Sequence, residues 1–254
     1  MQIAPPGIQF ETTLLTASRS AIETRIINLH RAGDLVEASK SCILALRDGH
    51  ELRLTTVERL IIDLSNGSQE QYDLCKLAIE RGYNLSTPTV ESTIVHFQNG
   101  SKEQYELCKL AIERDYELRL PTVETAIIHL LNGSQEQYDL CKLAIEKGYK
   151  LNPKTIGTII IDLAKKHEVC GAYDLCKLAL DKEYDLDAGV VETIIIKSPK
   201  ASIEQYNLCM LAMEKRYRLN KVTIRRVIEN FPLGHPARSN LAEQARKIDH
   251  ILRP

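Results

Sequence analysis

Residues 87–118 read TPTVESTIVHFQNGSKEQYELCKLAIERDYEL, and most of the chain repeats this pattern with small changes. The first half carries Val90, Ile94 and Phe97 at helical spacing, with Val95 beside them, which predicts a helix with one apolar face. Thr87-Pro88 is typical of a helix start, because the hydroxyl caps the helix and proline lacks only an N–H that the first turn leaves unused. Asn99-Gly100 is typical of a helix end, because both residues tolerate the left-handed conformation.

The second half predicts a second helix that begins with a capping box. In such a box the Ser101 hydroxyl and the Gln104 amide each satisfy an unpaired N–H group near the helix start. The apolar face that follows is wider than a surface helix needs, so we expect neighbouring repeats to cover it on more than one side. The same box recurs at Ser68 and Gln71, at Ser134 and Gln137, and at Ser202 and Gln205.

Cysteine and tyrosine recur in columns, by which we mean equivalent positions of successive repeats. The columns are Cys42, Cys75, Cys108, Cys141, Cys176 and Cys209, then Tyr72, Tyr105, Tyr138, Tyr173 and Tyr206, then Tyr83, Tyr116, Tyr149, Tyr184 and Tyr217. A fixed period in the thirties is the mark of a protein whose repeats bury their apolar faces against one another. We therefore predict an all-α fold, a right-handed α-solenoid of about six helix-turn-helix repeats plus capping helices, with these side chains between consecutive repeats.

One domain with three parts is expected: an N-terminal segment or cap at 1–17, the solenoid at 18–231 and a capping helix at 232–254. The repeats cover about 18–52, 55–85, 87–118, 121–151, 153–186 and 188–219, and a further helix at about 222–231 begins a seventh. A charged last helix after the break at 232–236 suits the polar outer face that the end of a solenoid needs.

Composition argues against nucleic acid and membrane as obvious partners. The 254 residues contain 33 Lys and Arg against 34 Asp and Glu, a formal net charge of −1. Since no run approaches the roughly 18 apolar residues of a membrane span, and residues 1–10 lack a secretory pattern, we expect no membrane contact. Equivalent cysteines on stacked helices lie about 8–10 Å apart, too far for a disulfide. We expect reduced cysteines and a cytoplasmic monomer, and delivery to another compartment stays open.

Enzyme motifs are absent from the sequence. It has no glycine-rich phosphate loop, no His-Glu-x-x-His and no Cys-x-x-Cys, so we expect no catalytic residue, cofactor or metal. Asp63, His96, His129 and Asp162 are suitable zinc ligands by type. Helix spacing of about 8–10 Å would keep the four from converging on one ion.

Polar columns mark a candidate binding groove on the first helices. One column is Thr24, Arg59, Ser92, Thr125, Thr158, Thr193 and Arg226, and four residues later comes Asn28, Asp63, His96, His129, Asp162, Lys197 and Asn230. A threonine column precedes the first by three residues: Thr56, Thr89, Thr122, Thr155 and Thr223. This spacing places all three columns on one helix face, which in superhelices is typically concave. Two interpretations stay open, an ordinary solvated face and a groove for an extended partner.

A glutamate column stands in the first turns of the same helices, at Glu23, Glu58, Glu91, Glu124 and Glu192. Carboxylates there favour the positive end of the helix dipole. Five in register also predict an acidic stripe that would repel phosphate groups.

The first repeat, AIETRIINLHRAGDLVEASKSCILALRDGHEL at 21–52, resembles the pentatricopeptide repeat, a two-helix unit. The resemblance lies in the apolar positions and in the glycine and alanine spacing, that is, in Ile22, Ile26, Leu29, Gly33, Ala38 and Gly49. Later repeats are shorter, and tyrosine stands where the family has a small residue.

The resemblance implies single-stranded RNA binding, one base per repeat, read by the first polar column and by an Asn or Asp at the end of each unit. The end positions here are Leu54, Thr87, Leu120, Pro153 and Ala188, which lack that side chain, and the reading column has no aromatic for base stacking. The sequence therefore favours a non-enzymatic scaffold that binds a protein or extended peptide along its concave face. RNA binding is the alternative.

Overall fold

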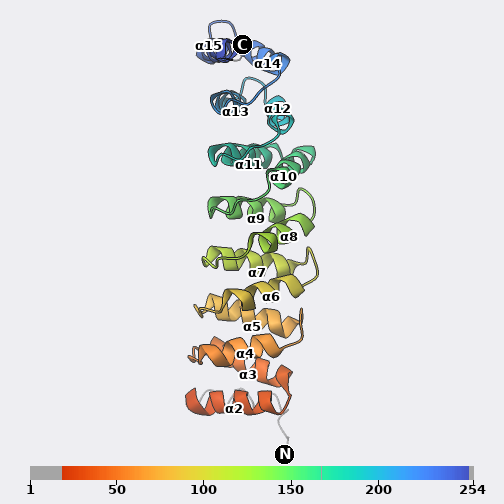
Figure 1. The fold of residues 1–254 in the computed structure, drawn as a ribbon, viewed down its shortest axis with the longest axis vertical. Coiled ribbons are helices and arrows are strands. Elements are labelled where there is room, and N and C mark those ends of the chain that lie inside the picture. The colour runs from red at the N-terminus through yellow and green to blue at the C-terminus, as the bar shows by residue number, and fades with distance from the viewer. Residues whose placement is uncertain (1–18, 167, 252–254) are drawn as a thin grey trace, which may run out of the picture. The chain divides into compact units, whose positions relative to one another are not determined.

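The structure, a computed structural model, describes residues 19–166 and 168–251 (Figure 1). Within these ranges all regular secondary structure is helical, with fourteen α-helices and no strand, so the all-α class is confirmed. The predicted N-terminal segment at 1–17 and the last residues of the predicted capping helix lie outside the described residues.

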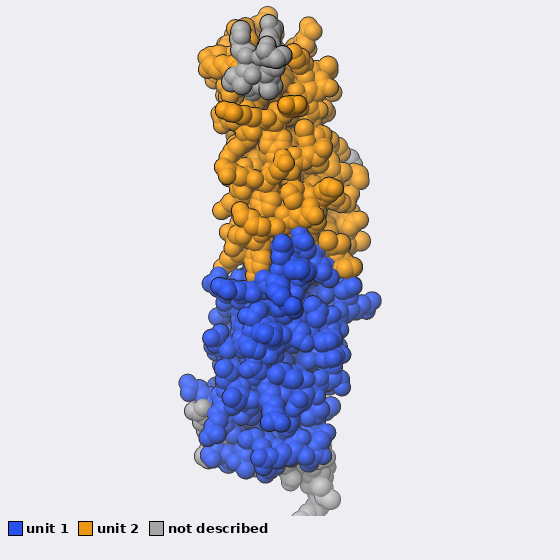
Figure 2. Space-filling model, viewed as in Figure 1, with its two compact units in different colours: residues 1–126 blue, residues 127–254 orange. Residues whose placement is uncertain are grey.

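The chain divides into two compact units, residues 1–126 and 127–254 (Figure 2). The N-terminal unit holds α2 (Arg19–Arg31), α3 (Leu35–Arg47), α4 (Leu54–Asp63), α5 (Gln69–Glu80), α6 (Thr87–His96) and α7 (Lys102–Glu113). Helix α8 (Leu120–His129) contains the boundary. The C-terminal unit holds α9 (Gln135–Glu146), α10 (Pro153–Lys165), α11 (Val169–Asp181), α12 (Ala188–Lys197), α13 (Ile203–Glu214), α14 (Lys221–Asn230) and α15 (Pro236–Ile251).

Helices form two rows within each unit (Figure 1). In the N-terminal unit the first helices of the repeats, α2, α4 and α6, contact one another in order, and the second helices α3, α5 and α7 form the other row. In the C-terminal unit α10, α12 and α14 make the first row, while α9, α11 and α13 make the second, with α15 against α13 and α14. Within each unit, a helix of these rows thus packs on the equivalent helix of the neighbouring repeat.

Cysteine side chains of the repeated column lie in the core, as predicted. All six are fully buried and free, whereas Cys170, outside the column, is exposed. Burial raises the pKa of each buried thiol to about 12, because a thiolate loses its hydration there. These thiols are packing groups that stay protonated at neutral pH.

The second tyrosine column joins consecutive repeats through backbone hydrogen bonds. The Tyr116 hydroxyl accepts from the N–H of Leu85 at 3.1 Å and donates to the carbonyl of Tyr83 at 2.8 Å. In the C-terminal unit the Tyr217 hydroxyl accepts from the N–H of Leu186 at 3.0 Å. Each ring therefore fixes the loop that leaves the preceding repeat. In the other tyrosine column Tyr72 is buried and the remaining four rings are half-buried.

The capping boxes differ from the prediction in one bond. Ser68 caps α5 as expected, since its hydroxyl accepts from the N–H of Gln71 at 3.2 Å. The Gln71 amide oxygen, however, accepts from Gly67, before the cap, at 3.0 Å, and its nitrogen donates to the Ile61 carbonyl at 3.0 Å. The buried glutamine consequently ties the turn to both helices of its own repeat.

Left-handed glycines occupy two kinds of turn. Gly67, between α4 and α5, has φ +71° and approaches the next repeat so closely that an added Cβ would lie 2.6 Å from the His96 carbonyl oxygen. Gly82, after α5, has φ +80° and open space around the Cβ position. Glycine adopts this conformation at the lowest cost, although Asp115, Glu183 and Arg216 adopt it at the position equivalent to Gly82 and Ala201 at the position equivalent to Gly67. At Gly67 the close contact with the next repeat is a second constraint.

We expect Gly67→Ala to lower the free energy of unfolding by about 1–3 kcal/mol more than Gly82→Ala does, because only the first substitution adds a clash to the left-handed strain of about 1–2 kcal/mol. Urea unfolding of both variants measures the difference. Equal losses would show that the repeats do not approach each other at this turn.

We also expect one thiol of the seven in the sequence to react with Ellman's reagent in the native protein, and all seven in denaturant. Cys170 is exposed and the other six are buried. Cys170→Ser is the control, and should remove the native reaction. Rapid native labelling of several column cysteines would contradict the packing.

Candidate partner-binding face

Two of the three predicted polar columns, the one that begins at Thr24 and the one that begins at Asn28, lie on the outward side of the first helices. Thr24, Asn28, Arg59, Asp63, Ser92, His96, His129, Thr158, Lys197 and Arg226 are exposed, and Thr125, Asp162, Thr193 and Asn230 are half-buried. The residues predicted to end each unit are instead the first residues of helices α4, α6, α8, α10 and α12; they are Leu54, Thr87, Leu120, Pro153 and Ala188. The two columns are therefore accessible to a partner within each unit.

Several column residues are held in place by polar contacts. In the N-terminal unit Asp63 binds His30 of the preceding first helix, with 2.7 Å between its Oδ2 and the imidazole Nε2. Within α6 the Ser92 hydroxyl lies 3.3 Å from His96 Nδ1. In the C-terminal unit the Lys197 ammonium donates to the Ala164 carbonyl at 2.8 Å. These contacts limit the conformations of the face before any partner arrives.

The threonine column does not line this face, contrary to the expectation. Thr89, Thr122 and Thr223 are buried and Thr56 and Thr155 are half-buried, because each sits in the first helical turn, where the preceding repeat covers it. The Thr89 hydroxyl donates to Glu58 of that repeat at 2.9 Å, and Thr122 donates to Glu91 at 3.3 Å.

The glutamate column is likewise no acidic stripe. Each carboxylate with a resolved contact accepts from a backbone N–H at the start of the next first helix: Glu23 from Arg53 at 2.5 Å, Glu58 from Ser86 at 2.8 Å, Glu91 from Arg119 and Glu192 from Asn220. Such bonds satisfy donors that the helix itself leaves unpaired. We call this contact between a glutamate and the start of the next first helix the Glu–Thr lock, since threonine completes it at Glu58 and Glu91.

Electrostatics of the lock favour an ionised carboxylate. Burial of Glu58 opposes its charge, but hydrogen bonds from Ser86 and Thr89 outweigh burial and hold the pKa below its usual value. A carboxyl group whose pKa is lowered by folding stabilises the protein above its unfolded pKa, and that stabilisation is lost as the pH falls.

We expect Glu58→Gln to lower the free energy of unfolding by about 1–2 kcal/mol at pH 7, since glutamine keeps the acceptor but removes the charge. The difference in free energy of unfolding between the native protein and the variant should shrink as the pH falls from neutrality through the usual titration range of a carboxyl group. Urea unfolding at a series of pH values measures it, with Glu117→Gln as an exposed control. A gap independent of pH would contradict the charged lock.

An aliphatic column on the same face was not predicted. The residue before each of the first six members of the second polar column is aliphatic: Ile27, Ile62, Val95, Ile128, Ile161 and Ile196. Ile62 is 58% exposed, Val95 47%, Ile128 50% and Ile196 41%. Val95, which the sequence places beside the apolar face, is thus exposed in the structure. The sequence shows that these residues recur at one position of the repeat. Helical periodicity, however, places that position next to the buried residues and does not predict that it is exposed.

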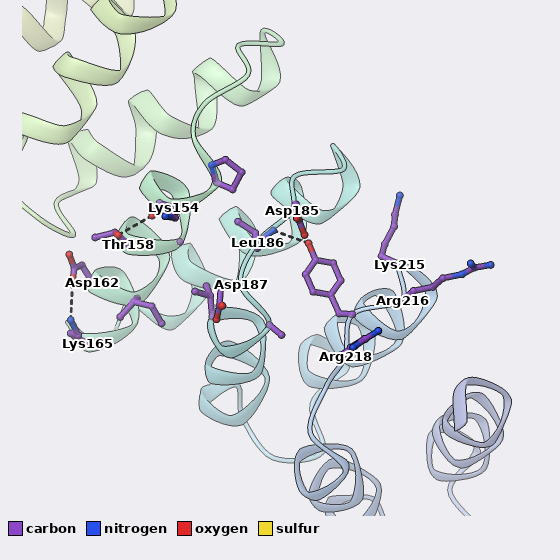
Figure 3. Close-up of a pocket in the computed structure, with 16 residues that line it drawn as sticks. Lys154, Thr158, Asp162, Lys165, Asp185, Leu186, Asp187, Lys215, Arg216 and Arg218 are labelled. Carbon is purple, nitrogen blue, oxygen red and sulfur yellow. Dashed lines mark hydrogen bonds and ion pairs between the residues drawn. The ribbon is translucent and has the colours of Figure 1, made fainter. Parts of the chain in front are cut away.

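The face is hollowed along α10 in the C-terminal unit (Figure 3). A cavity of about 910 Å³ runs along this helix past Thr158, Ile161 and Asp162, so it brings together members of both polar columns and of the aliphatic column. Its other wall comes from the segment that precedes α12 and the segment that follows α13. Asp162 is held there by Lys165 at 3.0 Å.

In the N-terminal unit a cavity of about 550 Å³ lies between α2 and α4. Arg31, Arg53, Arg59 and His30 line it over a floor that includes Ile26 and Leu60, and no acidic residue is among its lining. Arg53 is paired with Glu23 at 3.5 Å, and Arg59 and His30 with Asp63 at 3.7 and 2.7 Å, so carboxylates outside the lining balance most of this charge.

Within residues 19–166 and 168–251, no three His, Cys, Asp or Glu side chains gather closely enough to hold a metal ion. None of the described helices is long and apolar enough to cross a bilayer. The sequence matches no known family model and no curated protein sequence. The candidate site accordingly consists of the two polar columns, the aliphatic column and the cavities beside them.

Proposed function

We propose that the protein is a non-enzymatic scaffold that binds a protein or extended peptide along the first-helix face. In this proposal the helix pairs form a right-handed α-solenoid of about six repeats with capping helices, similar to pentatricopeptide repeats, and the face is its concave surface. Six buried free cysteines suit a reducing compartment such as the cytoplasm.

The exposed aliphatic column is the observation that carries the proposal. Aliphatic side chains left in solvent on successive helices gain roughly 25 cal/mol for each Å² that a partner covers. Hydrogen-bonding groups stand directly beside them, as at Asp63 next to Ile62 and His96 next to Val95. An apolar stripe rimmed by polar residues is typical of protein interaction sites.

Contacts between repeats also take the glutamate and threonine columns away from the outward face. The locked glutamates and buried threonines point into the junctions, so their oxygens bind the neighbouring repeat and are not offered to a ligand on the surface. What remains outward is amphipathic, and none of the residues of the two polar columns or the aliphatic column is Phe, Tyr or Trp, the side chains on which single-stranded bases stack.

To test this, the chain is immobilised and used to capture partners from an extract of its own cells. We expect Ile128→Asn with Ile196→Asn, and Ile62→Asn with Val95→Asn, each to reduce recovery of a specific partner at least about tenfold through lost apolar contact. Ile203→Asn is the matched control, since Ile203 is 62% exposed on the second-row helix α13. Equal recovery by native chain, column variants and control would refute the proposal.

RNA binding is the second candidate because three arginines line the cavity between α2 and α4. It predicts association with random single-stranded RNA that weakens steeply with salt and with Arg59→Ala and Arg226→Ala. Filter binding at low and high salt measures this. Tight, salt-sensitive binding that survives the aliphatic-column substitutions would favour RNA over a protein partner.

A further inference from the structure

Three of the turns between the two helices of a repeat carry an asparagine followed by a glycine. The pairs are Asn66-Gly67, Asn99-Gly100 and Asn132-Gly133, and each asparagine is exposed. In an Asn-Gly pair the side-chain amide is open to attack by the next main-chain nitrogen, because glycine has no side chain to shield that nitrogen. The proposed function makes no use of these pairs.

The reaction open to such a pair is deamidation through a cyclic imide. The glycine N–H loses its proton to solvent, and the nitrogen forms a bond to the asparagine Cγ. The bond from Cγ to the side-chain nitrogen breaks, and that nitrogen takes up a proton and leaves as ammonia. Water then opens the imide at one of its two carbonyl carbons. The product is aspartate, or isoaspartate, in which the main chain runs through the side chain and is one carbon longer.

The attacking nitrogen is held by a buried glutamine in all three turns. Each glycine N–H donates to the amide oxygen of the glutamine: Gly67 to Gln71 at 3.0 Å, Gly100 to Gln104 at 3.0 Å and Gly133 to Gln137 at 2.8 Å. The glutamines are at most 3% exposed. The nitrogen of the imide carries no hydrogen, so ring closure must break this bond and leave a buried oxygen without its donor, which is costly.

Other hydrogen bonds hold the same turn closed. In the first of the three turns the Gln71 nitrogen donates to the Ile61 carbonyl at 3.0 Å, which fixes the glutamine. The Ser68 N–H donates to the Ser65 carbonyl at 3.0 Å, across the Asn-Gly pair. The glycine nitrogen is therefore released only when the turn opens.

The glutamine bond also occurs where no asparagine precedes it. The Ala201 N–H donates to the amide oxygen of Gln205 at 3.2 Å, and Lys200 stands at the asparagine position. The bond is thus a general feature of this turn, and the protection of asparagine is a consequence of it.

The isoaspartate product would not fit the closed turn. A Cβ added at Gly67 would lie 2.6 Å from the His96 carbonyl oxygen, and one added at Gly133 would lie 3.0 Å from the Asp162 carbonyl oxygen. Isoaspartate directly before such a glycine adds a main-chain carbon where the next repeat leaves no room for a methyl group.

We propose that the three asparagines are deamidation sites that the folded chain holds unreactive through the glutamine of the same turn. Modification proceeds from a repeat whose turn has opened, and isoaspartate formed there prevents the turn from closing as before. The three pairs thus record irreversibly the opening of individual repeats.

To test this, the full chain is aged in mildly alkaline buffer with and without urea. Mass spectrometry and chromatography of proteolytic peptides measure asparagine, aspartate and isoaspartate at each site, and a sample digested without ageing corrects for reaction during digestion. We expect each site to react at least about tenfold more slowly in the folded chain than in urea, as for groups that react through local opening. Equal rates in the folded and unfolded chain would overturn the inference.

Gln71→Met and Gln137→Met test the glutamine bond itself, because methionine fills the site without the amide. We expect Gln71→Met to speed deamidation of Asn66 about two- to tenfold, the range of one hydrogen bond, and to leave Asn132 unchanged. Gln137→Met should do the reverse, since the two sites lie in different units. Faster reaction at all sites in both variants would overturn the role of the glutamine.

Ser68→Ala is the matched control, because it removes the cap of α5 and keeps the bond from Gly67 to Gln71. We expect it to speed deamidation of Asn66 less than Gln71→Met does. Equal acceleration would assign the protection to the helix start and overturn the inference. Helical circular dichroism checks that each variant is folded.

Refolding tests the effect of the product. Chains aged in urea until they carry isoaspartate, and then refolded, should unfold at a lower urea concentration than chains refolded at once. Identical unfolding curves would overturn the statement that isoaspartate prevents the turn from closing.

Discussion

Every repeat of this protein depends on its neighbour to satisfy backbone groups that its own helices leave unpaired. A carboxylate such as Glu58 reaches the start of the next first helix, and a tyrosine hydroxyl such as Tyr116 reaches the loop of the preceding repeat. Buried polar backbone groups without partners are costly, so a helix pair alone could not hold these loops. Apolar contact supplies the bulk of the cohesion, and these bonds fix the register between repeats.

The same constraint decides what the surface can present. Because glutamate and threonine side chains turn into the junctions, the outward face of the first helices keeps two polar columns and an aliphatic one. The glutamate column, which predicts an acidic stripe in the sequence, instead binds the start of the next first helix in the structure. The chemistry left outside is amphipathic, and Arg31 and Arg59 line the cavity between α2 and α4.

Departure from the repeat is where specificity can arise. At the α10–α12 junction Gly157 and Val190 replace a polar pair by a smaller apolar one, and the Asp187 side chain caps the start of α12. The fold is maintained there, and Gly157 lines the cavity of about 910 Å³ along α10. A repeat protein distinguishes positions along its ligand through such exceptions, since identical repeats would treat every residue of the ligand alike.

The sequence alone determined the helices, their pairing into hairpins and the burial of the cysteine column, because helical periodicity, caps and a fixed period are local signals. The sequence also shows that Gly157 and Val190 stand where the other repeats have the glutamate and the threonine. Only the tertiary structure decided that Glu58 and Thr89 meet across a junction and that Val95 faces solvent. Residues at the border of a helix's apolar face are buried or exposed according to how the neighbouring repeat is offset. That offset is set by packing between helices, which the periodicity of a single helix does not contain.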